Sequence, residues 1–520
     1  MNGAEAIVRS VVAAGVEVCF ANPGTSELQF AAALDAVPQL RGVLTLFEGV
    51  ATGAADGYAR IAGRPAMTLL HLGPGLGNGL ANLHNARRAA TPLLNVVGDH
   101  ATYHQRFDAQ LQSDIASVAR TVSVWQRSTT RAEDAGSDAV EAIAASCAPP
   151  GGVATLVVPA DVSWSEGGAV APPLPVPVAP LVPPDVVEEV AKALRSGEPS
   201  AMLLGGRALG GRGLEAAGRV AAATGARLLT ETFPARQARG AGLPAPERLA
   251  YLGEMALDQL AGVRRLVLAG ARAPVSFFAY PGKPSTLVPD GCAVETLATG
   301  AHDVVAALEA LADVLGAATA AGRSGATPGP ARPDRPRGPV TPGALAAAVA
   351  HLLPEGGIVV DESITSGISI PAATAHGPRH DWLALTGGAI GQGMPVATGA
   401  ALADPSRKVL CLEADGSAMY TLQALWTQAR EGLDVTTVVL ANRSYAILQF
   451  ELARVGGSAA GERAASLLDL SRPDLDFVSL ARGMGVPGHR VTTAEDLTDR
   501  LAAALFEDGP VVIEAALDGR

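Results

Sequence analysis

The chain lacks several features that would place it in a specialised class of protein. No apolar run approaches the roughly 18 to 20 residues that a membrane helix needs, although 48% of the 520 residues are hydrophobic. Only four cysteines occur, and their wide scatter argues against a disulfide framework or a zinc site. The chain has 39 lysine and arginine residues against 51 aspartate and glutamate residues. The resulting net charge of −12 disfavours binding to nucleic acid and to anionic membranes. We therefore expect a soluble protein that binds neither.

The first 20 residues also lack the features of an export signal. Their apolar positions have helical spacing, without a basic start, a long apolar stretch or a small-residue cleavage site. Together with the scattered cysteines, this predicts a reduced, cytoplasmic setting.

Two segments have compositions typical of linkers. Residues 166–185 are too rich in proline for a helix or an interior strand, and residues 318–341 mix glycine, proline and arginine with few large apolar residues. Since 520 residues exceed a single core, we predict domains at 1–165, 186–317 and 342–520.

Short β-rich runs alternate with alanine-rich helical segments in each predicted domain. This alternation predicts an α/β fold of three domains, each with a mostly parallel sheet flanked by helices. The runs, bounded by Gly, Pro or Asp, span residues 16–20, 43–46, 66–72, 92–98, 154–159, 200–206, 226–232, 264–270, 357–362, 408–415, 434–442 and 510–515.

An acidic residue ends one of these runs, where 408–415 read KVLCLEAD and Gly416 and Ser417 open a helix. Ligands of open α/β sheets bind beyond the carboxyl ends of strands, and a helix N-terminus favours anions. Asp415 would repel a phosphate there, but a Mg²⁺ ion with oxygen ligands would join the two. Asn442, at the end of the next predicted strand, offers a second oxygen. Taken alone, Asp415 is better explained as a helix cap and Asn442 as the start of a turn.

Together, Asp415 and Asn442 resemble the metal signature of thiamine-diphosphate enzymes, a Gly-Asp-Gly followed further along by Asn-Asn. Here Ala414 and Ala441 replace the first residue of each group. The resemblance implies that Asp415, Asn442 and the backbone carbonyl of Ser444 bind Mg²⁺. It also implies a pyrimidine-binding first domain and a diphosphate-binding last domain around a central one. Further cofactor-binding residues by the same resemblance are Gly416, Ser417, Tyr445 and Ala446.

A second segment of the last domain resembles the part of this family that holds the aminopyrimidine ring. Residues 386–399 read TGGAIGQGMPVATG. By this resemblance the carbonyl of Gly388 accepts a hydrogen bond from the exocyclic amine, and Ile390 bends the cofactor. A glycine-rich turn from strand to helix with a buried isoleucine is the alternative explanation.

Glu48 is the candidate for activating the cofactor. Removal of a proton from the thiazolium ring requires a carboxylate against N1′ of the pyrimidine, and Glu48 opens a helix of small residues after an apolar run. A helix-initial Glu is otherwise a partner of the helix dipole. Glu48 with the following GYARIAGRPA resembles the catalytic segment of the 2-oxo acid decarboxylase and acetolactate synthase family. In that family the first and last domains of different chains share a site, which implies at least a homodimer, or a homotetramer.

The substrate side resembles benzoylformate decarboxylase. In the segments FANPGTSELQF and LHLGPGLGNG, Thr25 would help to hold the substrate carboxylate and His71 would transfer protons. A helix cap and a buried structural histidine are the alternatives. The central segment APVSFFAYPGKPS lacks the second histidine of that enzyme, and Ile447 and Glu451 fall where a pocket wall would form.

The residues and the resemblance together predict thiamine-diphosphate- and Mg²⁺-dependent decarboxylation of a small-molecule 2-oxo acid, with carboligation to a second carbonyl as in acetolactate synthase. A non-ligating decarboxylase resembling benzoylformate decarboxylase is the first alternative. A non-catalytic regulatory or scaffold paralogue is the second, motivated by the replaced residues. The GGRALGGRG stretch of the central domain is a weak signal for FAD.

Overall fold

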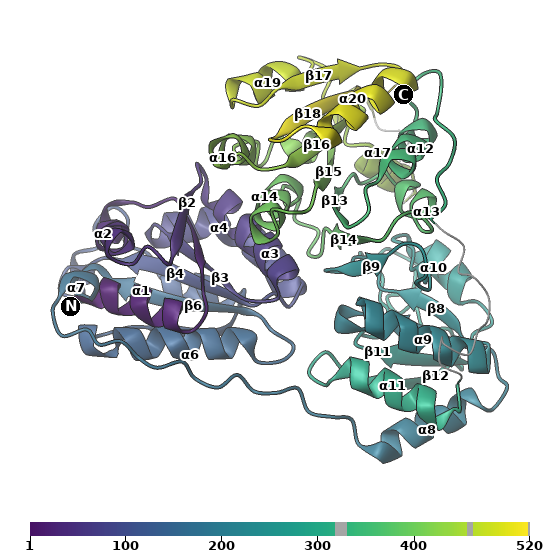
Figure 1. The fold of residues 1–520 in the computed structure, drawn as a ribbon, viewed down its shortest axis with the longest axis horizontal. Helices are drawn as coiled ribbons and strands as arrows, with labels where there is room; N and C mark the ends of the chain where they lie inside the picture. The colour runs from purple at the N-terminus through teal and green to yellow at the C-terminus, as the bar shows by residue number, and fades with distance from the viewer. Residues whose placement is uncertain (318–329, 455–460, 518–520) are drawn as a thin grey trace.

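The computed structural model describes residues 1–317, 330–454 and 461–517. Figure 1 shows three units, each built around one sheet, with the first and last units in contact and the central unit beneath the last. Among the described helices, none has both the length and the apolar character to cross a membrane. All four cysteines are free.

The first unit contains a six-stranded parallel sheet in the order β2-β1-β3-β4-β6-β5. One apolar cluster covers each face of this sheet. The strands are β1 (Val18–Ala21), β2 (Arg41–Leu44), β3 (Ala66–Leu70), β4 (Leu93–Asp99), β5 (Ser123–Ser128) and β6 (Val153–Pro159). The helices are α1 (Gly3–Ala13), α2 (Leu28–Ala36), α3 (Glu48–Ala62), α4 (Leu72–Arg88), α5 (Ile115–Arg120), α6 (Ala135–Cys147) and α7 (Ala160–Trp164).

The central unit contains a five-stranded parallel sheet in the order β10-β8-β7-β11-β12. Its strands are β7 (Ser200–Leu204), β8 (Arg227–Thr230), β10 (Glu247–Arg248), β11 (Arg265–Ala269) and β12 (Ala293–Ala298). Its helices are α8 (Pro184–Leu194), α9 (Gly211–Thr224), α10 (Gly253–Leu260) and α11 (Val304–Val314).

The last unit contains a seven-stranded sheet in the order β17-β18-β16-β15-β13-β14-β9. All its pairings are parallel except the edge pairing of β14 with β9. Its strands are β9 (Gln237–Arg239), β13 (Gly357–Glu362), β14 (His380–Ala384), β15 (Val409–Ala414), β16 (Val435–Ala441), β17 (Gly488–Val491) and β18 (Val511–Ala516). Its helices are α12 (Pro342–Leu352), α13 (Ile370–Ala373), α14 (Gly393–Ala403), α15 (Asp415–Ala418), α16 (Ala424–Glu431), α17 (Ala446–Arg454), α18 (Glu462–Ser466), α19 (Phe477–Gly483) and α20 (Ala494–Phe506).

The predicted α/β class, with three mostly parallel sheets flanked by helices, is confirmed. Each apolar run named in the sequence overlaps a strand, whereas β5, β12, β14 and the shorter β9, β10 and β17 were not predicted. Their side chains explain the difference, because β5 lies at a sheet edge with mixed exposure and β14 begins with His380 and Asp381. Such strands lack the continuous apolar run of a central parallel strand.

The predicted domain boundaries stay a prediction, although the linkers have the expected character where they are described. Residues 167–183 contain no helix or strand, and Figure 1 shows this segment running along the edge of the molecule to α8. Residues 318–329 lie outside the described residues, and 330–341 contain no helix. One strand crosses the predicted division, since β9 lies within 186–317 in sequence but joins the sheet of the last unit.

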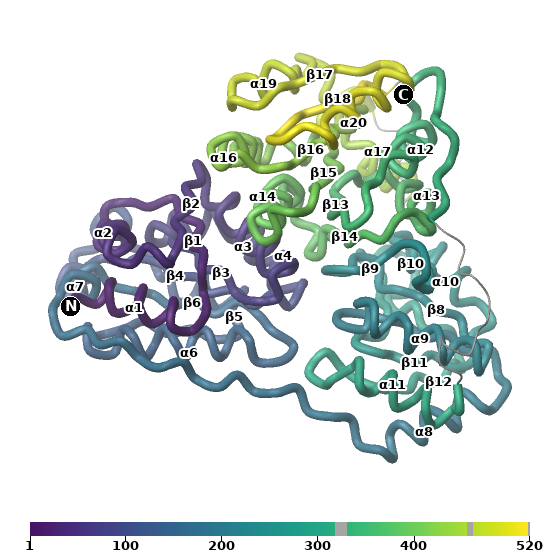
Figure 2. Tube along the Cα trace, viewed as in Figure 1, coloured from purple at the N-terminus to yellow at the C-terminus, as the bar shows by residue number. Residues whose placement is uncertain are grey.

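Small residues allow α3 and α14 to pack closely, which joins the first unit to the last. A Cβ atom at Gly57 would lie 2.1 Å from the carbonyl oxygen of Val396, and one at Gly399 would lie 1.8 Å from that of Ala54. Figure 2 shows the two helices side by side. Val50 of α3 accordingly belongs to the apolar core of the last unit.

Candidate cofactor site

The predicted metal-binding residues meet at the carboxyl ends of two neighbouring strands. Strands β15 and β16 pair in parallel, with Ala414 beside Leu440, so the residues that follow them leave the same edge of the sheet. Asp415 accepts a hydrogen bond from the backbone N–H of Arg443 at 2.6 Å and another from that of Gly416 at 2.8 Å. The predicted proximity of Asp415 to the loop after β16 is therefore present in the structure.

Burial makes Asp415 a carboxylate that favours a counterion. Its exposed fraction is 3%, and burial raises its pKa to about 6, against the opposing effect of the N–H groups of Arg443 and Gly416. Asn442 turns its side-chain oxygen to the N–H of Ser444 at 3.0 Å and donates to Ser366 at 3.0 Å. Among the described residues, no group of three or more His, Cys, Asp or Glu side chains is placed to hold a metal ion.

The donor set nevertheless fits a hard divalent cation. One buried carboxylate, one amide oxygen and one backbone carbonyl from Asp415, Asn442 and Ser444 are oxygen ligands, and Mg²⁺ takes few protein ligands where substrate phosphates supply the rest. Space at the loop is also restricted, because a Cβ atom at Gly416 would lie 2.4 Å from the Tyr445 ring. Ala414 has an ordinary extended backbone, with φ −76° and ψ 143°. Alanine at this position therefore leaves the loop unstrained.

The predicted single helix after Asp415 is divided into α15 and α16. Between them, the hydroxyl of Thr421 donates to the carbonyl of Gly391 at 3.0 Å. This contact ties the diphosphate side of the predicted site to the turn predicted to hold the aminopyrimidine ring.

The turn before α14 adopts a conformation that requires glycine. Gly388 has φ +75°, and a Cβ atom there would lie 2.8 Å from the Phe277 ring. Within the described residues no group donates to the Gly388 carbonyl, whereas Asn85 and His84 of α4 bind the neighbouring carbonyls of Ala389 and Gly387 at 2.8 and 3.2 Å. The Gly388 carbonyl is thus free to accept the hydrogen bond that the family resemblance implies.

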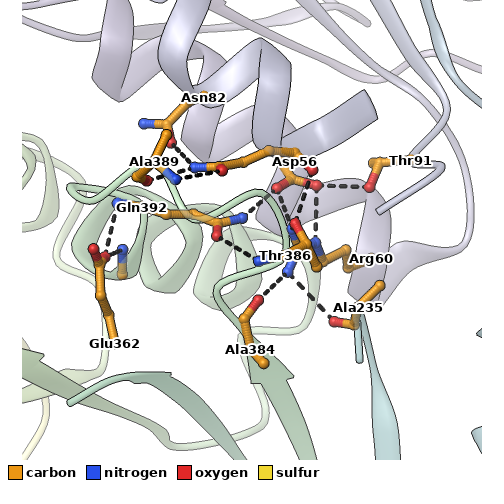
Figure 3. Close-up of polar contacts among 12 residues, drawn as sticks. Asp56, Arg60, Asn82, Thr91, Ala235, Glu362, Ala384, Thr386, Ala389 and Gln392 are labelled. Atoms are coloured by element: carbon orange, nitrogen blue, oxygen red, sulfur yellow. Dashed lines mark hydrogen bonds and ion pairs between the residues drawn. The ribbon is translucent and has the colours of Figure 1, made fainter. Parts of the chain in front are cut away.

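Polar residues that the sequence did not indicate hold this turn from behind, as Figure 3 shows. Glu362, at the end of β13, accepts hydrogen bonds from the N–H groups of Gly391 at 2.7 Å, Gln392 at 2.8 Å and Gly393. Burial raises the pKa of Glu362 to about 7. The Gln392 amide donates to Asp56 of α3 at 2.8 Å. The first unit therefore forms a direct hydrogen bond with the turn.

Glu48 lies at the other end of α3, where the helix begins as predicted. Its carboxylate is buried and accepts a hydrogen bond from Asn78 of α4 at 3.0 Å. A Cβ atom at Gly75 would lie 3.1 Å from that carboxylate and 3.3 Å from the Cβ of His71, so Glu48 and His71 flank the same residue. Across the described ranges, no hydrogen bond or ion pair joins Glu48 to Asp415 or Asn442.

His71 forms a pair with a carboxylate that was missed in the sequence. Its Nδ1 lies 2.8 Å from the carboxylate of Glu27 and 3.2 Å from the hydroxyl of Ser26. Glu27 is completely buried and also accepts the N–H of Gly24 at 2.9 Å. Thr25, the predicted carboxylate-binding residue, begins the same short 3₁₀ helix, while its neighbour Ser26 makes the contact with His71.

The glycine-rich segment after His71 is helical, and residues 72–79 form the first turns of α4. His71 thus precedes a helix N-terminus with its ring fixed by Glu27. The spacing Thr-Ser-Glu before an apolar run could have indicated Glu27, since it places a carboxylate at a helix start.

Comparisons with known proteins identify the family of the chain. Residues 1–119 match the family described as "Thiamine pyrophosphate enzyme, N-terminal TPP binding domain", and residues 367–515 match "Thiamine pyrophosphate enzyme, C-terminal TPP binding domain". A Mycobacterium tuberculosis H37Rv protein called "Putative acetolactate synthase large subunit IlvX" is 61% identical over 520 residues, 99% of each chain. Benzoylformate decarboxylase of Pseudomonas aeruginosa is 28% identical over 540 residues, 96% of each chain.

A solved structure extends the similarity to the whole fold. The "thiamine diphosphate-dependent 4-hydroxybenzoylformate decarboxylase" of Rhodococcus jostii RHA1 matches with a TM-score of 0.86 and 26% identity over 100% of both chains. Fold and site together define an α/β protein with a cofactor-binding unit at each end of the chain. The chain belongs to the thiamine pyrophosphate enzyme family, in the group that includes acetolactate synthase and benzoylformate decarboxylase.

Proposed function

We propose that the chain catalyses the thiamine-diphosphate- and Mg²⁺-dependent decarboxylation of a 2-oxo acid. The observation that carries the proposal is the buried Asp415, hydrogen-bonded to the loop after β16 at the carboxyl edge of the sheet. Asp415, Asn442 and the carbonyl of Ser444 would hold Mg²⁺ and, through it, the diphosphate. When bound, thiamine diphosphate supplies the electron sink that makes loss of carbon dioxide feasible.

Glu48 and Gly388 would act at the opposite end of the cofactor. Glu48 is buried and accepts a hydrogen bond from Asn78. Because burial disfavours a charged carboxylate without a cationic or donating partner, Glu48 would favour a proton at N1′ of the pyrimidine. The free carbonyl of Gly388 would accept a hydrogen bond from the exocyclic amine of the pyrimidine, and Ile390 would lie beneath the cofactor. These roles follow from the family and are supported by the burial of Glu48 and the backbone of the turn.

The pair His71 and Glu27 supports release of an aldehyde as the outcome. An imidazole oriented by a buried carboxylate can hold a proton at Nε2 and deliver it to the carbon that has lost carbon dioxide. Ligation to a second carbonyl, the outcome expected from sequence, is the second candidate. It is supported by the relative with 61% identity, which is named as an acetolactate synthase subunit.

We further propose that the working site is shared in at least a homodimer. Glu48 and Asp415 would bind opposite ends of the cofactor. In the described part of one chain, however, no hydrogen bond or ion pair connects these two residues. A partner chain that supplied the missing half would complete both sites by symmetry.

The test uses the purified full chain, freed of metal and cofactor by chelation. Calorimetry with thiamine diphosphate and Mg²⁺ should show binding at micromolar cofactor, and pyruvate or benzoylformate should then release carbon dioxide. Glu48→Gln should keep the cofactor affinity but lower turnover by at least about a hundredfold. Analysis of the product as aldehyde, acetolactate or hydroxyketone separates the two outcomes. Absence of binding at millimolar cofactor would instead favour the scaffold paralogue.

A further inference from the structure

One face of α4 carries three asparagines that contact both ends of the predicted site. Asn78, Asn82 and Asn85 are four and three residues apart, a spacing that places them on the same side of a helix. Asn82 and Asn85 are buried, at 3% and 0% exposure. A buried side-chain amide needs hydrogen-bond partners for its two N–H groups and for its oxygen. The partners of these amides therefore show what this face of α4 holds in place.

Helix α4 binds every second carbonyl of the turn before α14. The contacts are those of Gly387 with Nε2 of His84 at 3.2 Å, Ala389 with Asn85 at 2.8 Å and Gly391 with Asn82 at 3.1 Å. The carbonyl of Gly388 lies between the first two and has no donor among the described residues. The side chains of α4 thus occupy the neighbouring carbonyls and leave this one for a ligand.

Asn85 fixes the direction of the Gly388 carbonyl through a shared peptide group. The N–H of Ala389 belongs to the same peptide as that carbonyl and donates to Oδ1 of Asn85 at 3.3 Å. This peptide is trans, and in a trans peptide the N–H and the C=O point in opposite directions. The Gly388 carbonyl therefore points away from Asn85. Since Asn85 also accepts no other role at the turn than to bind both polar groups of Ala389, its loss would release this peptide.

Asn82 connects the turn to the start of α3. Its amide donates to the carbonyl of Gly391 at 3.1 Å and to that of Gly49, the residue after Glu48, at 2.8 Å. Its oxygen accepts the second N–H of Asn85 at 2.9 Å. Both N–H groups and the oxygen of Asn82 are therefore used. A buried polar network with every member satisfied is rigid, so the turn and the start of α3 are held at a fixed separation.

Asn78 extends this arrangement to the predicted base. It donates to the carboxylate of Glu48 at 3.0 Å and lies about one helical turn before Asn82. Glycine at 387 is needed for the close approach of the turn, because a Cβ atom at Gly387 would lie 2.3 Å from Oδ1 of Asn85. One face of α4 thus contacts Glu48, the peptide that follows it and the turn.

We propose that Asn82 and Asn85 are positioning residues of the cofactor site. Asn85 would direct the Gly388 carbonyl toward the exocyclic amine, and Asn82 would hold Glu48 at a fixed distance from the turn. The inference rests on the proposed function and adds to it two residues that act through the turn and through Glu48. Loss of Asn85 should then weaken cofactor binding alone, whereas loss of Asn82 should affect both cofactor binding and turnover.

The first experiment measures cofactor affinity and kcat separately on the full chain with thiamine diphosphate and Mg²⁺. Affinity comes from calorimetry, and kcat from carbon dioxide release with pyruvate and with benzoylformate. Asn85→Ala should raise the Kd of thiamine diphosphate about tenfold, the effect of about one hydrogen bond, and leave kcat at saturating cofactor within about threefold. Asn82→Ala should raise the Kd by a similar factor and also lower kcat at least about tenfold, because Glu48 loses its fixed position. An unchanged Kd in Asn85→Ala, or the original kcat in Asn82→Ala, would overturn the assignment.

Two further variants separate positioning from packing and from stability. Asn82→Leu has nearly the volume of asparagine without its hydrogen bonds, so it should lose as much kcat as Asn82→Ala; recovery of kcat would show that packing alone matters. The matched control is Asn95, which is buried in the first sheet with Thr68 at 2.8 Å and Thr155 at 3.1 Å. Asn95→Ala should keep Kd and kcat within about threefold, because it contacts neither the turn nor Glu48. An equal loss in Asn95→Ala would trace the effects to stability and refute the positioning roles.

The second experiment uses the cofactor-free chain. Amide hydrogen exchange of Ala389 should accelerate about tenfold in Asn85→Ala, because its N–H loses the asparagine oxygen as acceptor, and it should not change in Asn95→Ala. Unchanged exchange of Ala389 in Asn85→Ala would contradict the orienting role. If Asn82→Ala failed to fold, the Kd and the exchange of Asn85→Ala would decide. An original chain that neither bound cofactor nor released carbon dioxide would overturn the proposed function and this inference together, whereas an active original chain with unaffected variants would overturn this inference alone.

Discussion

The pair of Asp56 with Arg60 should contribute strongly to the contact between the first and last units. Both side chains are buried, at 0% and 2% exposure, and their atoms meet at 2.5 and 2.8 Å. Arg60 also donates to the carbonyl of Ala384 at 3.0 Å and to the hydroxyl of Thr386 at 3.0 Å. We predict that Arg60→Met, which keeps the length of the side chain but removes its charge, loosens this contact.

The size of the effect follows from what Arg60→Met leaves behind. Asp56 would keep only Thr91 at 2.6 Å and Gln392 at 2.8 Å as donors. Breaking a buried pair from one side costs about 3 to 5 kcal/mol. The Ala384 carbonyl also loses its donor. The two costs in free energy do not simply sum, because the groups share one network. A total of about 4 kcal/mol corresponds to about a thousandfold in the local opening equilibrium.

Amide hydrogen exchange is the suitable assay, because a chain of three units does not unfold in one step. Exchange in α3 and in residues 386–393 should accelerate about a thousandfold in Arg60→Met. The double variant Asp56→Asn with Arg60→Met should recover part of the loss, since no unpaired charge remains buried. The matched control Arg212→Met breaks an exposed pair and should cost less than about 1 kcal/mol. Protection in Arg60→Met within about tenfold of the original chain would refute the reasoning.

Three further predictions concern single residues. Glu27→Gln should lower kcat at least about tenfold, with cofactor affinity by calorimetry unchanged, because His71 loses the carboxylate that orients its ring; an unchanged kcat would count against the pair. Gly388→Ala should weaken cofactor binding at least about tenfold, because a φ of +75° is strained for alanine and its Cβ would meet Phe277; equal affinity would contradict this. Burial lowers the pKa of His380 to about 4, so the folded state should lose stability as pH falls from about 6.5 to 4, as the unfolded chain takes up the proton. His380→Gln should reduce the loss between pH 7.5 and 5 by about 2 kcal/mol, measured by amide hydrogen exchange in β14 and corrected for the intrinsic pH dependence of exchange, and an equal loss in both chains would exclude His380 as the cause.

The carboxyl ends of strands were the most predictable part of the site. Asp415 and Asn442 follow apolar runs long enough to be recognised as buried parallel strands, and consecutive strands of such a sheet are usually neighbours. Their proximity therefore follows from the sequence without knowledge of the rest of the fold. The place of Glu48 at the start of a helix of small residues was also predictable locally, whereas its proposed role depends on the family resemblance.

Contacts between distant segments could not be predicted. Glu27 and His71 are 44 residues apart, and Glu362 binds a turn about 30 residues away, with separations of 29, 30 and 31. Each pairing depends on how two strand ends and a helix are stacked, which no local pattern encodes. The charge of Glu451 shows the same limit, since its cation Arg454 lies three residues away but its partner Tyr280 lies 171 residues away.

Helix α3 connects the two ends of the proposed catalytic arrangement. Glu48 begins this helix, and Asp56, eight residues later, lies about 12 Å along its axis and holds the cofactor turn of its own chain through Gln392. In the proposed dimer, Glu48 would serve the cofactor of the partner chain. Helix α3 would then hold Glu48 for the partner chain's cofactor and, through Asp56, contact the cofactor turn of its own chain. A disturbance of that turn would therefore move Glu48 as well. Arg60→Met should for this reason lower kcat more than it lowers cofactor affinity, and a loss confined to affinity would show that α3 does not couple the two sites.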